Sequence, residues 1–237
     1  MLSELLLSAA LGSFTVLDSA AHSADHYTQG LFFDGGVLYE TTGHYGESRL
    51  FRYSAPGKSP MDSAKLESRY FGEGSIKLGD DIFWLTWREG TAFIYDARTF
   101  ARKSAFSIPT EGWGLAFYQG SLLMSDGSQN LYLLSPGDKN IYRNIPVFDD
   151  TNSVTNLNEL EVIGNVAYAN IWQSDSIAAI DLNSGKVLKW YDFSKIARAV
   201  RKKFPGAEVL NGIAFDGKAF WITGKNWPVM YKVLIKP

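Results

Sequence analysis

The chain has 237 residues, of which 46% are hydrophobic and 20% are charged, as expected for a soluble globular protein with a substantial core. A net charge of -2 gives no electrostatic footprint for a nucleic-acid backbone, and no stretch interleaves basic and aromatic residues. Because the chain contains no cysteine, disulfides, zinc-thiolate sites and cysteine nucleophiles are excluded.

The first thirteen residues, MLSELLLSAALGS, resemble part of a secretory signal. However, Glu4 stands where a basic segment should be, and the apolar run is short. The compartment therefore stays open, with a periplasmic or secreted protein favoured. No other stretch approaches the roughly 18 consecutive apolar residues of a membrane span, so a membrane partner is not expected.

From residue 35 onward the chain repeats itself. A glycine followed by an apolar run and a small polar residue recurs as GVLYETT, GDDIFWLT, GSLLMS, GNVAYAN and GKAFWIT. The glycines are Gly35, Gly79, Gly120, Gly164 and Gly217, so the steps between them are 44, 41, 44 and 53 residues. A third run follows in each copy, as RLFRYS, TAFIYDA, NLYLLS, SIAAIDL and MYKVLI. A period of about 40 to 50 residues with four strands per unit is typical of propeller blades.

The outermost strand of each unit is expected at KLESRYF, KSAFSI, RNIPVF and VLKWYDF. The last repeat ends before it has such a strand, and the segment SFTVLDS at residues 13–19 can supply it. We therefore predict one all-β domain over residues 1–237. It is a five-bladed β-propeller with four-stranded antiparallel blades, and an N-terminal strand closes the ring.

The long last step predicts one short inserted helix at residues 193–206, FSKIARAVRKKFPG. Ser194 is the expected N-cap, and Pro205 with Gly206 is the expected stop. Its apolar stripe comprises Ile196, Val200 and Phe204. The five basic residues indicate a solvated face, and a lid or a partner surface is the alternative.

The register of the repeats collects polar and aromatic side chains at one mouth of the ring. The innermost strands should begin with Gln29, Glu73, Trp113, Asn158 and Asn211. The second strands run antiparallel to the first, so their ends reach the same mouth. Those ends carry Gly43 to Tyr45, Trp87, Asp126, Trp172, Lys225 and Trp227. A concave site with aromatic walls and a few polar groups is typical of a small-ligand pocket.

Each of these residues also has a structural interpretation. The glycines beside Glu73 in FGEGS could serve only a tight turn between blades, Lys225 could be a surface lysine, and the tryptophans could pack between blades. Asp126 in MSDGS is expected to cap a turn. His22, His26 and His44 match neither a metal-binding motif nor a catalytic triad, so no metal site is expected at them.

At these same residues the sequence resembles the glutaminyl-peptide cyclotransferases of the plant and bacterial type, which are five-bladed propellers unrelated to the zinc-dependent animal enzymes. The resemblance runs from about Phe14 to Val233, through YTQGL, TTGHYGES, FGEG, LTW, EGWGL, MSDGS, LNELE, YANIW, VLNGIA and TGKNWP. One departure precedes YTQGL, where relatives usually have a His-Asp-Pro type segment and this chain has HSADH. The path of the substrate on that side is therefore open.

The resemblance implies an enzyme that converts the N-terminal glutamine of peptides or proteins into pyroglutamate and releases ammonia. It implies that Glu73 is the catalytic carboxylate, assisted by Asn158 and Lys225. The residues that would shape the substrate site are Gln29, Trp87, Trp113 and Trp172. No cofactor is expected, a structural cation such as calcium in the central channel is left open, and a monomer is expected.

The alternative is a propeller that only binds a peptide or small ligand at that mouth. A binder without activity should lack the carboxylate or the lysine, and this chain has both. The chemistry also favours the enzyme, because one carboxylate can accept the proton of the attacking amine and return it to the departing nitrogen.

Overall fold

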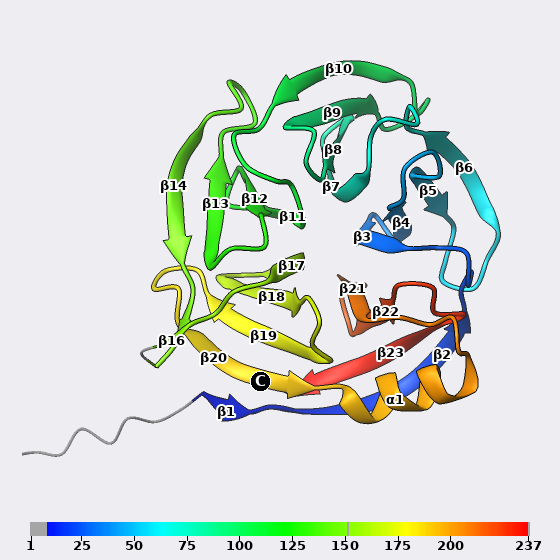
Figure 1. Cartoon of the computed structure of the whole chain (residues 1–237), viewed down its shortest axis with the longest axis vertical. Helices are drawn as coiled ribbons and strands as arrows, with labels where there is room; N and C mark the ends of the chain where they lie inside the picture. The colour runs from blue at the N-terminus through cyan, green and yellow to red at the C-terminus, as the bar shows by residue number, and fades with distance from the viewer. Residues whose placement is uncertain (1–8, 151, 237) are drawn as a thin grey trace, which may run out of the picture.

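The computed structural model describes residues 9–150 and 152–236 of the chain. Apart from one small hairpin, its strands form five sheets, each with four antiparallel strands, arranged as a ring around a central axis (Figure 1). The predicted all-β, five-bladed propeller is confirmed. The possible secretory signal falls largely on residues 1–8, which lie outside the described residues.

Each blade is numbered by its place in the chain, and its strands are given from the axis outward. Blade 1 contains β3 (Thr28–Asp34), β4 (Val37–Thr42), β5 (Arg49–Tyr53) and β6 (Pro60–Lys65). Blade 2 contains β7 (Gly72–Leu78), β8 (Asp81–Thr86), β9 (Thr91–Asp96) and β10 (Arg102–Ser107). Blade 3 contains β11 (Leu115–Tyr118), β12 (Ser121–Ser125), β13 (Asn130–Leu134) and β14 (Ile141–Pro146).

The last two blades are joined by the N-terminal segment. Blade 4 contains β17 (Leu157–Ile163), β18 (Val166–Ile171), β19 (Ser176–Asp181) and β20 (Val187–Asp192), with β1 (Ala10–Leu11) added in parallel to β20. Blade 5 contains β21 (Leu210–Phe215), β22 (Phe220–Gly224), β23 (Val229–Lys236) and β2 (Ser13–Ala21). A small hairpin of β15 (Phe148–Asp149) and β16 (Asn152–Ser153) lies between blades 3 and 4 in the sequence.

The ring closes through β2, as the sequence predicts. This strand pairs antiparallel with β23, from Ser13 opposite Lys236 to Ala21 opposite Val229. Figure 1 shows β2 and the last strand of the chain, β23, side by side at the outer edge of blade 5. The N-terminal segment therefore covers the outer edges of two neighbouring blades, through β1 as well as β2.

The repeated glycines form the hairpins between the first and second strands of the blades. All five have positive φ angles, which a glycine adopts without steric cost. In blade 1 both Gly35 and Gly36 are in this conformation, between the paired residues Asp34 and Val37. This is the pattern of a type I′ hairpin turn, whose twist matches that of the strands.

Two expectations about local structure are wrong. The outer strand of blade 1 is not KLESRYF at 65–71 but β6, because an outer strand is solvated and needs no apolar pattern. The apolar residues of 65–71 turn inward instead, and Leu66 is buried between blades 1 and 2. Ser194 is not the N-cap but the first residue of the helix, and its N–H donates to the Asp192 carboxylate at 2.8 Å.

The helix α1 (Ser194–Lys203) lies at the outer edge of the ring beside β2 (Figure 1). Ala197 and Val200 are buried against blades 4 and 5, while Arg201 forms a two-pronged ion pair with Asp175. Its other basic residues, Lys195, Arg198, Lys202 and Lys203, are exposed. A solvated basic face, rather than a lid over the mouth, fits this position. Within the described residues, no helix is long and apolar enough to cross a bilayer.

Five clusters of buried apolar residues hold neighbouring blades together, one at each junction. Phe32 and Leu50 of blade 1 pack with Ile82 and Trp84 of blade 2, for example. The junction that closes the ring packs Leu31 of blade 1 and other residues against blade 5. Because hydrophobic burial is the main stabilising contribution, the ring depends on all five junctions.

Removing residues 1–19 should destabilise the propeller, because it deletes β1 and most of β2 and exposes the edge of β23. We expect a large loss of soluble protein and of cooperative thermal unfolding, measured by size-exclusion chromatography and circular dichroism. A truncation of residues 1–8, which removes no described strand, is the control. A soluble, cooperatively folding protein without residues 1–19 would contradict this account of closure.

Candidate active site

A cavity of about 160 Å³ opens at one mouth of the ring. It is lined by Tyr27, His44, Phe71, Glu73, Trp87, Trp113, Asn158, Trp172 and Lys225. Six of the seven predicted site residues therefore converge there, although they come from four different blades. Trp227, which the register also places near this mouth, is fully buried in the core and packs on Gly224.

Glu73 reaches the cavity because two glycines let neighbouring blades approach each other closely. A Cβ atom at Gly74 would lie 2.6 Å from the carbonyl oxygen of Trp113 in the next blade. One at Gly72 would lie 3.0 Å from the carbonyl oxygen of Thr42 in blade 1, and 2.8 Å from the Trp84 ring of its own blade. Neither glycine has a positive φ angle, and both lie at the start of β7 rather than in a turn. The flanking glycines are thus required by packing and not by a turn between blades.

The polar residues at the mouth stand on irregularities of the innermost strands. The pairing register shifts between Gly72 and Ser75 in β7, and similar shifts occur in β3, β17 and β21. The shift in β7 spans Glu73, and those in β3, β17 and β21 span Gln29, Asn158 and Asn211, respectively. A β-bulge bends a strand and redirects a side chain, and it is common next to active sites.

Hydrogen bonds between blades hold these irregular segments in place. The hydroxyl of Thr41, near the end of β4, donates to the carbonyl oxygen of Glu73 at 2.8 Å. The hydroxyl of Ser125, at the end of β12, donates in the same way to Asn158 at 2.7 Å. The small polar residue that ends the repeated apolar run therefore positions the site residue of the next blade in these two cases.

Glu73 is 4% exposed, and among the described residues its carboxylate has one side-chain hydrogen-bond partner, Gln29. The Gln29 amide donates to Glu73 Oε1 at 2.9 Å, and its own oxygen accepts from Asn211 Nδ2 at 3.2 Å. Gln29 lies behind the carboxylate and is not among the residues that line the cavity. Gln29 therefore contacts the carboxylate from outside the cavity lining, although the family resemblance implied that it shapes the substrate site.

Lys225 and Asn158 face the same cavity and are buried, with exposures of 3% and 2%. The Lys225 ammonium lies 4.5 Å from the centre of the Tyr27 ring, where a cation-π interaction stabilises it. Asn158 Oδ1 has no hydrogen-bond partner among the described residues. A buried and unpaired amide oxygen at a cavity wall is suited to accept a hydrogen bond from a ligand.

Burial changes the acid-base properties of both ionisable groups. It raises the pKa of Glu73 well above the usual carboxyl range, Glu111 and Glu89 raise it further, and Lys225 opposes them. Burial lowers the pKa of Lys225, against the opposing effect of Glu73 and Glu208. Strongly shifted pKa values in a cavity are typical of groups that transfer protons.

Glu111 fixes two walls of the cavity at once. Its Oε2 accepts hydrogen bonds from the indole nitrogens of Trp87 at 2.8 Å and Trp113 at 2.9 Å. Its Oε1 accepts from Arg88, whose guanidinium lies 3.7 Å from the centre of the Trp87 ring. Trp172 completes this side, edge to face with Trp113, and is 37% exposed at the opening.

Sequence reasoning placed His44 at the mouth only as part of the segment Gly43 to Tyr45, and it missed Tyr27, Phe71 and Glu111. Each lies within or beside a motif already singled out, namely YTQGL, TTGHYGES, FGEG and EGWGL. The signal was therefore present, but the register of the repeats points only to the first residue of each inner strand and to the end of each second strand. Asp126 accepts from the N–H of Ser128 at 3.0 Å, which confirms its predicted role in a turn.

Comparison with known proteins agrees with this geometry. Residues 5–235 match the protein family described as glutamine cyclotransferase. A glutaminyl-peptide cyclotransferase of Arabidopsis thaliana is 36% identical over 239 residues, covering 99% of this chain and 75% of the relative. The crystal structure of Myxococcus xanthus glutaminyl cyclase superposes with a TM-score of 0.88 at 31% identity, covering 96% of this chain and 98% of that one. The polar and aromatic site on a five-bladed propeller is consistent with these matches. The chain belongs to the glutamine cyclotransferase family.

Proposed function

We propose that this chain acts as a glutaminyl-peptide cyclotransferase in which Glu73 carries the protons of the reaction. It converts the N-terminal glutamine of a peptide or protein into pyroglutamate and releases ammonia, an intramolecular acyl transfer. The observation that carries the proposal is a buried carboxylate with a raised pKa, opposite a buried lysine in a cavity walled by tryptophan. The family membership supports the same activity.

In the reaction, the α-amine nitrogen of glutamine attacks the carbon of its own side-chain amide. A carbon-nitrogen bond forms as the α-amine loses a proton, and the bond from that carbon to the departing nitrogen breaks as this nitrogen gains a proton. Ionised Glu73 accepts the first proton and returns it to the leaving group, so no proton is lost overall. Such general acid-base catalysis contributes typically 10²–10⁴ in rate.

The negative charge that develops on the amide oxygen requires hydrogen-bond donors. Lys225 and the amide group of Asn158 line the cavity and supply them in this proposal. One such donor is typically worth about 10²–10³ in rate. Asn158 Oδ1, unpaired in the structure, accepts an N–H group of the substrate.

The aromatic walls hold the glutamine side chain in the conformation that closes the ring. The attacking amine and the leaving nitrogen already belong to one molecule. The rate acceleration that the walls can add therefore comes from holding both groups in the reactive geometry. The cavity of about 160 Å³ is small, so the rest of the peptide would extend past the exposed Trp172 of its lining. Exposed Tyr45 lies nearby, edge to face with Phe71 of the lining. The proposed reaction uses only side chains of the chain itself, and the chelator experiment below tests whether a metal takes part.

The direct test is ammonia release from a glutamine-initiated dipeptide, and Glu73→Gln is the decisive variant. The substitution keeps the shape but cannot accept a proton, so we expect the fold and melting temperature to stay unchanged and kcat to fall by about 10²–10⁴. The native activity should be the same with and without a chelator. More than about a tenth of native kcat in Glu73→Gln would exclude Glu73 from this role and favour a propeller that only binds peptides.

Replacing Lys225 by Met should shift the pH profile upward. Glu73 must be ionised to accept a proton, so kcat/KM falls as the pH drops through its raised pKa. The Lys225 charge lowers that pKa, and its removal raises the pKa further. We therefore expect the acidic limb of kcat/KM to move to higher pH, together with a lower kcat. A profile of Lys225→Met with the shape and position of the native one would contradict the coupling.

Replacing Glu111 by Gln should move the acidic limb of kcat/KM to lower pH, opposite to the effect of Lys225→Met. Glu111→Gln removes a negative charge that raises the Glu73 pKa but keeps an oxygen that can accept from both indoles. We expect the acidic limb to move to lower pH with KM almost unchanged. Glu111→Ala also releases Trp87 and Trp113, so it should raise KM in addition. Equal KM values for the two variants would argue against a positioning role for the carboxylate.

A further inference from the structure

A second group of ionisable side chains lies outside the catalytic cavity, where the N-terminal segment joins blades 1 and 5. His22 follows β2, His26 lies four residues later, and Glu40 belongs to β4. Their ligand-type atoms all lie within 4.8 Å of one another. Glu40 Oε1 is 2.9 Å from His22 Nε2, and Oε2 is 2.9 Å from His26 Nδ1.

We propose that His22, His26 and Glu40 form a binding site for a divalent transition-metal ion, with Zn²⁺ as the representative ion. Two imidazoles and one carboxylate are a ligand set that zinc accepts, whereas calcium and magnesium require more oxygen ligands. Zinc bonds to these ligands are roughly 2.0–2.2 Å long, and two such bonds to atoms 2.9 Å apart enclose about 90°. Such an angle suits an ion that also binds solvent.

The surroundings of the three ligands resemble the outer shell of a metal site. His22 Nδ1 lies 2.6 Å from the carbonyl oxygen of Trp227, which can only accept, so this nitrogen carries a proton and Nε2 is directed at Glu40. The Glu40 carboxylate accepts further hydrogen bonds from Thr28 at 2.8 Å and Tyr53 at 3.0 Å. Ring nitrogens bonded to backbone carbonyls and carboxylates held by hydroxyls orient metal ligands in this way.

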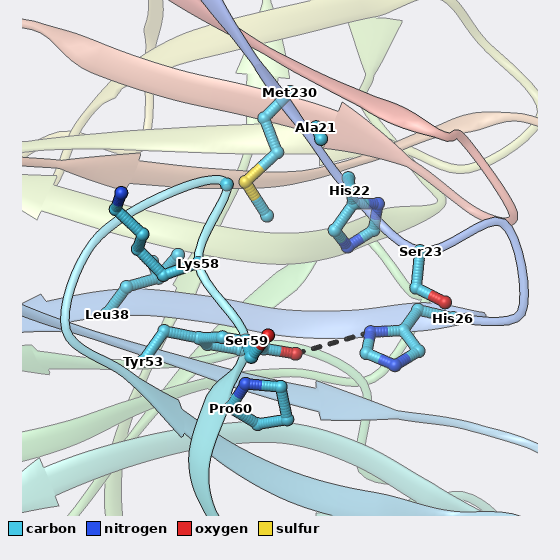
Figure 2. Close-up of a pocket in the computed structure, with 11 residues that line it drawn as sticks. Ala21, His22, Ser23, His26, Leu38, Tyr53, Lys58, Ser59, Pro60 and Met230 are labelled. Atoms are coloured by element: carbon cyan, nitrogen blue, oxygen red, sulfur yellow. Dashed lines mark hydrogen bonds between the residues drawn. The ribbon is translucent and has the colours of Figure 1, made fainter.

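An adjoining cavity of about 350 Å³ gives an ion access to the site. Figure 2 shows His22, Ser23, His26 and Tyr53 at one end of it, with Met230 and Leu38 as apolar lining. The His26 side chain is 16% exposed, and its ring stacks on Phe51 with the ring centres 4.5 Å apart, which holds it beside Glu40. The cavity also has room for the water molecules that would complete the coordination.

An ion at this position would stabilise the closed ring and would take no part in the reaction. Its ligands join the segment after β2 to β4 of blade 1, and His22 is bonded to Trp227 of blade 5. It therefore links three parts of the chain that meet only in the closed propeller. A ligand that binds the folded state alone raises the melting temperature as its concentration rises.

The test uses the full chain after removal of metals, titrated with ZnCl₂ by calorimetry and followed by thermal unfolding. We expect one zinc ion per chain and a melting temperature that rises with zinc. His26→Gln can still donate to Glu40 but is a poor zinc ligand, so it should bind zinc at least about tenfold more weakly. Its metal-free melting temperature shows whether the variant folds. His44→Ala, which removes the third histidine of the chain, should bind zinc as the native chain does.

Cobalt(II) provides a second, independent measurement, because its visible absorption reports the nitrogen ligands directly. The native chain should give a spectrum that His26→Gln alters. No stoichiometric binding of Zn²⁺ by the native chain would mean that the three side chains form a hydrogen-bonded cluster only, and the proposal would be overturned. Equal zinc affinity of the native chain and His26→Gln would overturn it as well.

Discussion

The burial of the Glu73 carboxylate at the mouth of the ring is the constraint on which the rest of the site depends. A carboxylate removed from water is held in place only if the surrounding structure compensates for its lost hydration. Gln29 provides a hydrogen bond, Lys225 provides a positive charge, and the glycines on either side allow the close approach of the next blade. The same burial raises the Glu73 pKa and makes it suitable for proton transfer.

The site also explains why a closed ring is needed. Glu73 and Trp87 belong to blade 2, Asn158 belongs to blade 4, and Lys225 directly follows β22 in blade 5. No pair of neighbouring blades therefore contains the whole site. The apolar clusters at the junctions and the hydrogen bonds from Thr41 and Ser125 set the spacing between these residues. The contacts that stabilise the ring therefore also set the geometry of the site. Strand β2 is distant from the catalytic cavity but contributes to both.

Much of this arrangement could be predicted from the sequence, because the glycine spacing repeats and fixes a register. That register placed Glu73, Trp113 and Asn158 at the axis, and it placed Lys225 at the same mouth. Individual side-chain contacts could not be predicted in this way. The role of Glu111 depends on where two indole nitrogens point. The grouping of His22 and His26 with Glu40 depends on the pairing of β2, just before His22, with β23 at the other end of the chain. Outer strand β6 was misplaced because a solvated edge carries no apolar pattern.

The central claim is that Glu73 changes protonation state during the reaction, from a pKa raised by its buried position. The most direct measurement is a pH titration of the native chain with carbon-13-labelled glutamate, followed by NMR and assigned by the signal that is absent in Glu73→Gln. The account predicts a midpoint well above the ordinary carboxyl pKa of about 4.3, coinciding with the acidic limb of kcat/KM. A midpoint in the ordinary range, or one unrelated to the kinetic limb, would contradict it.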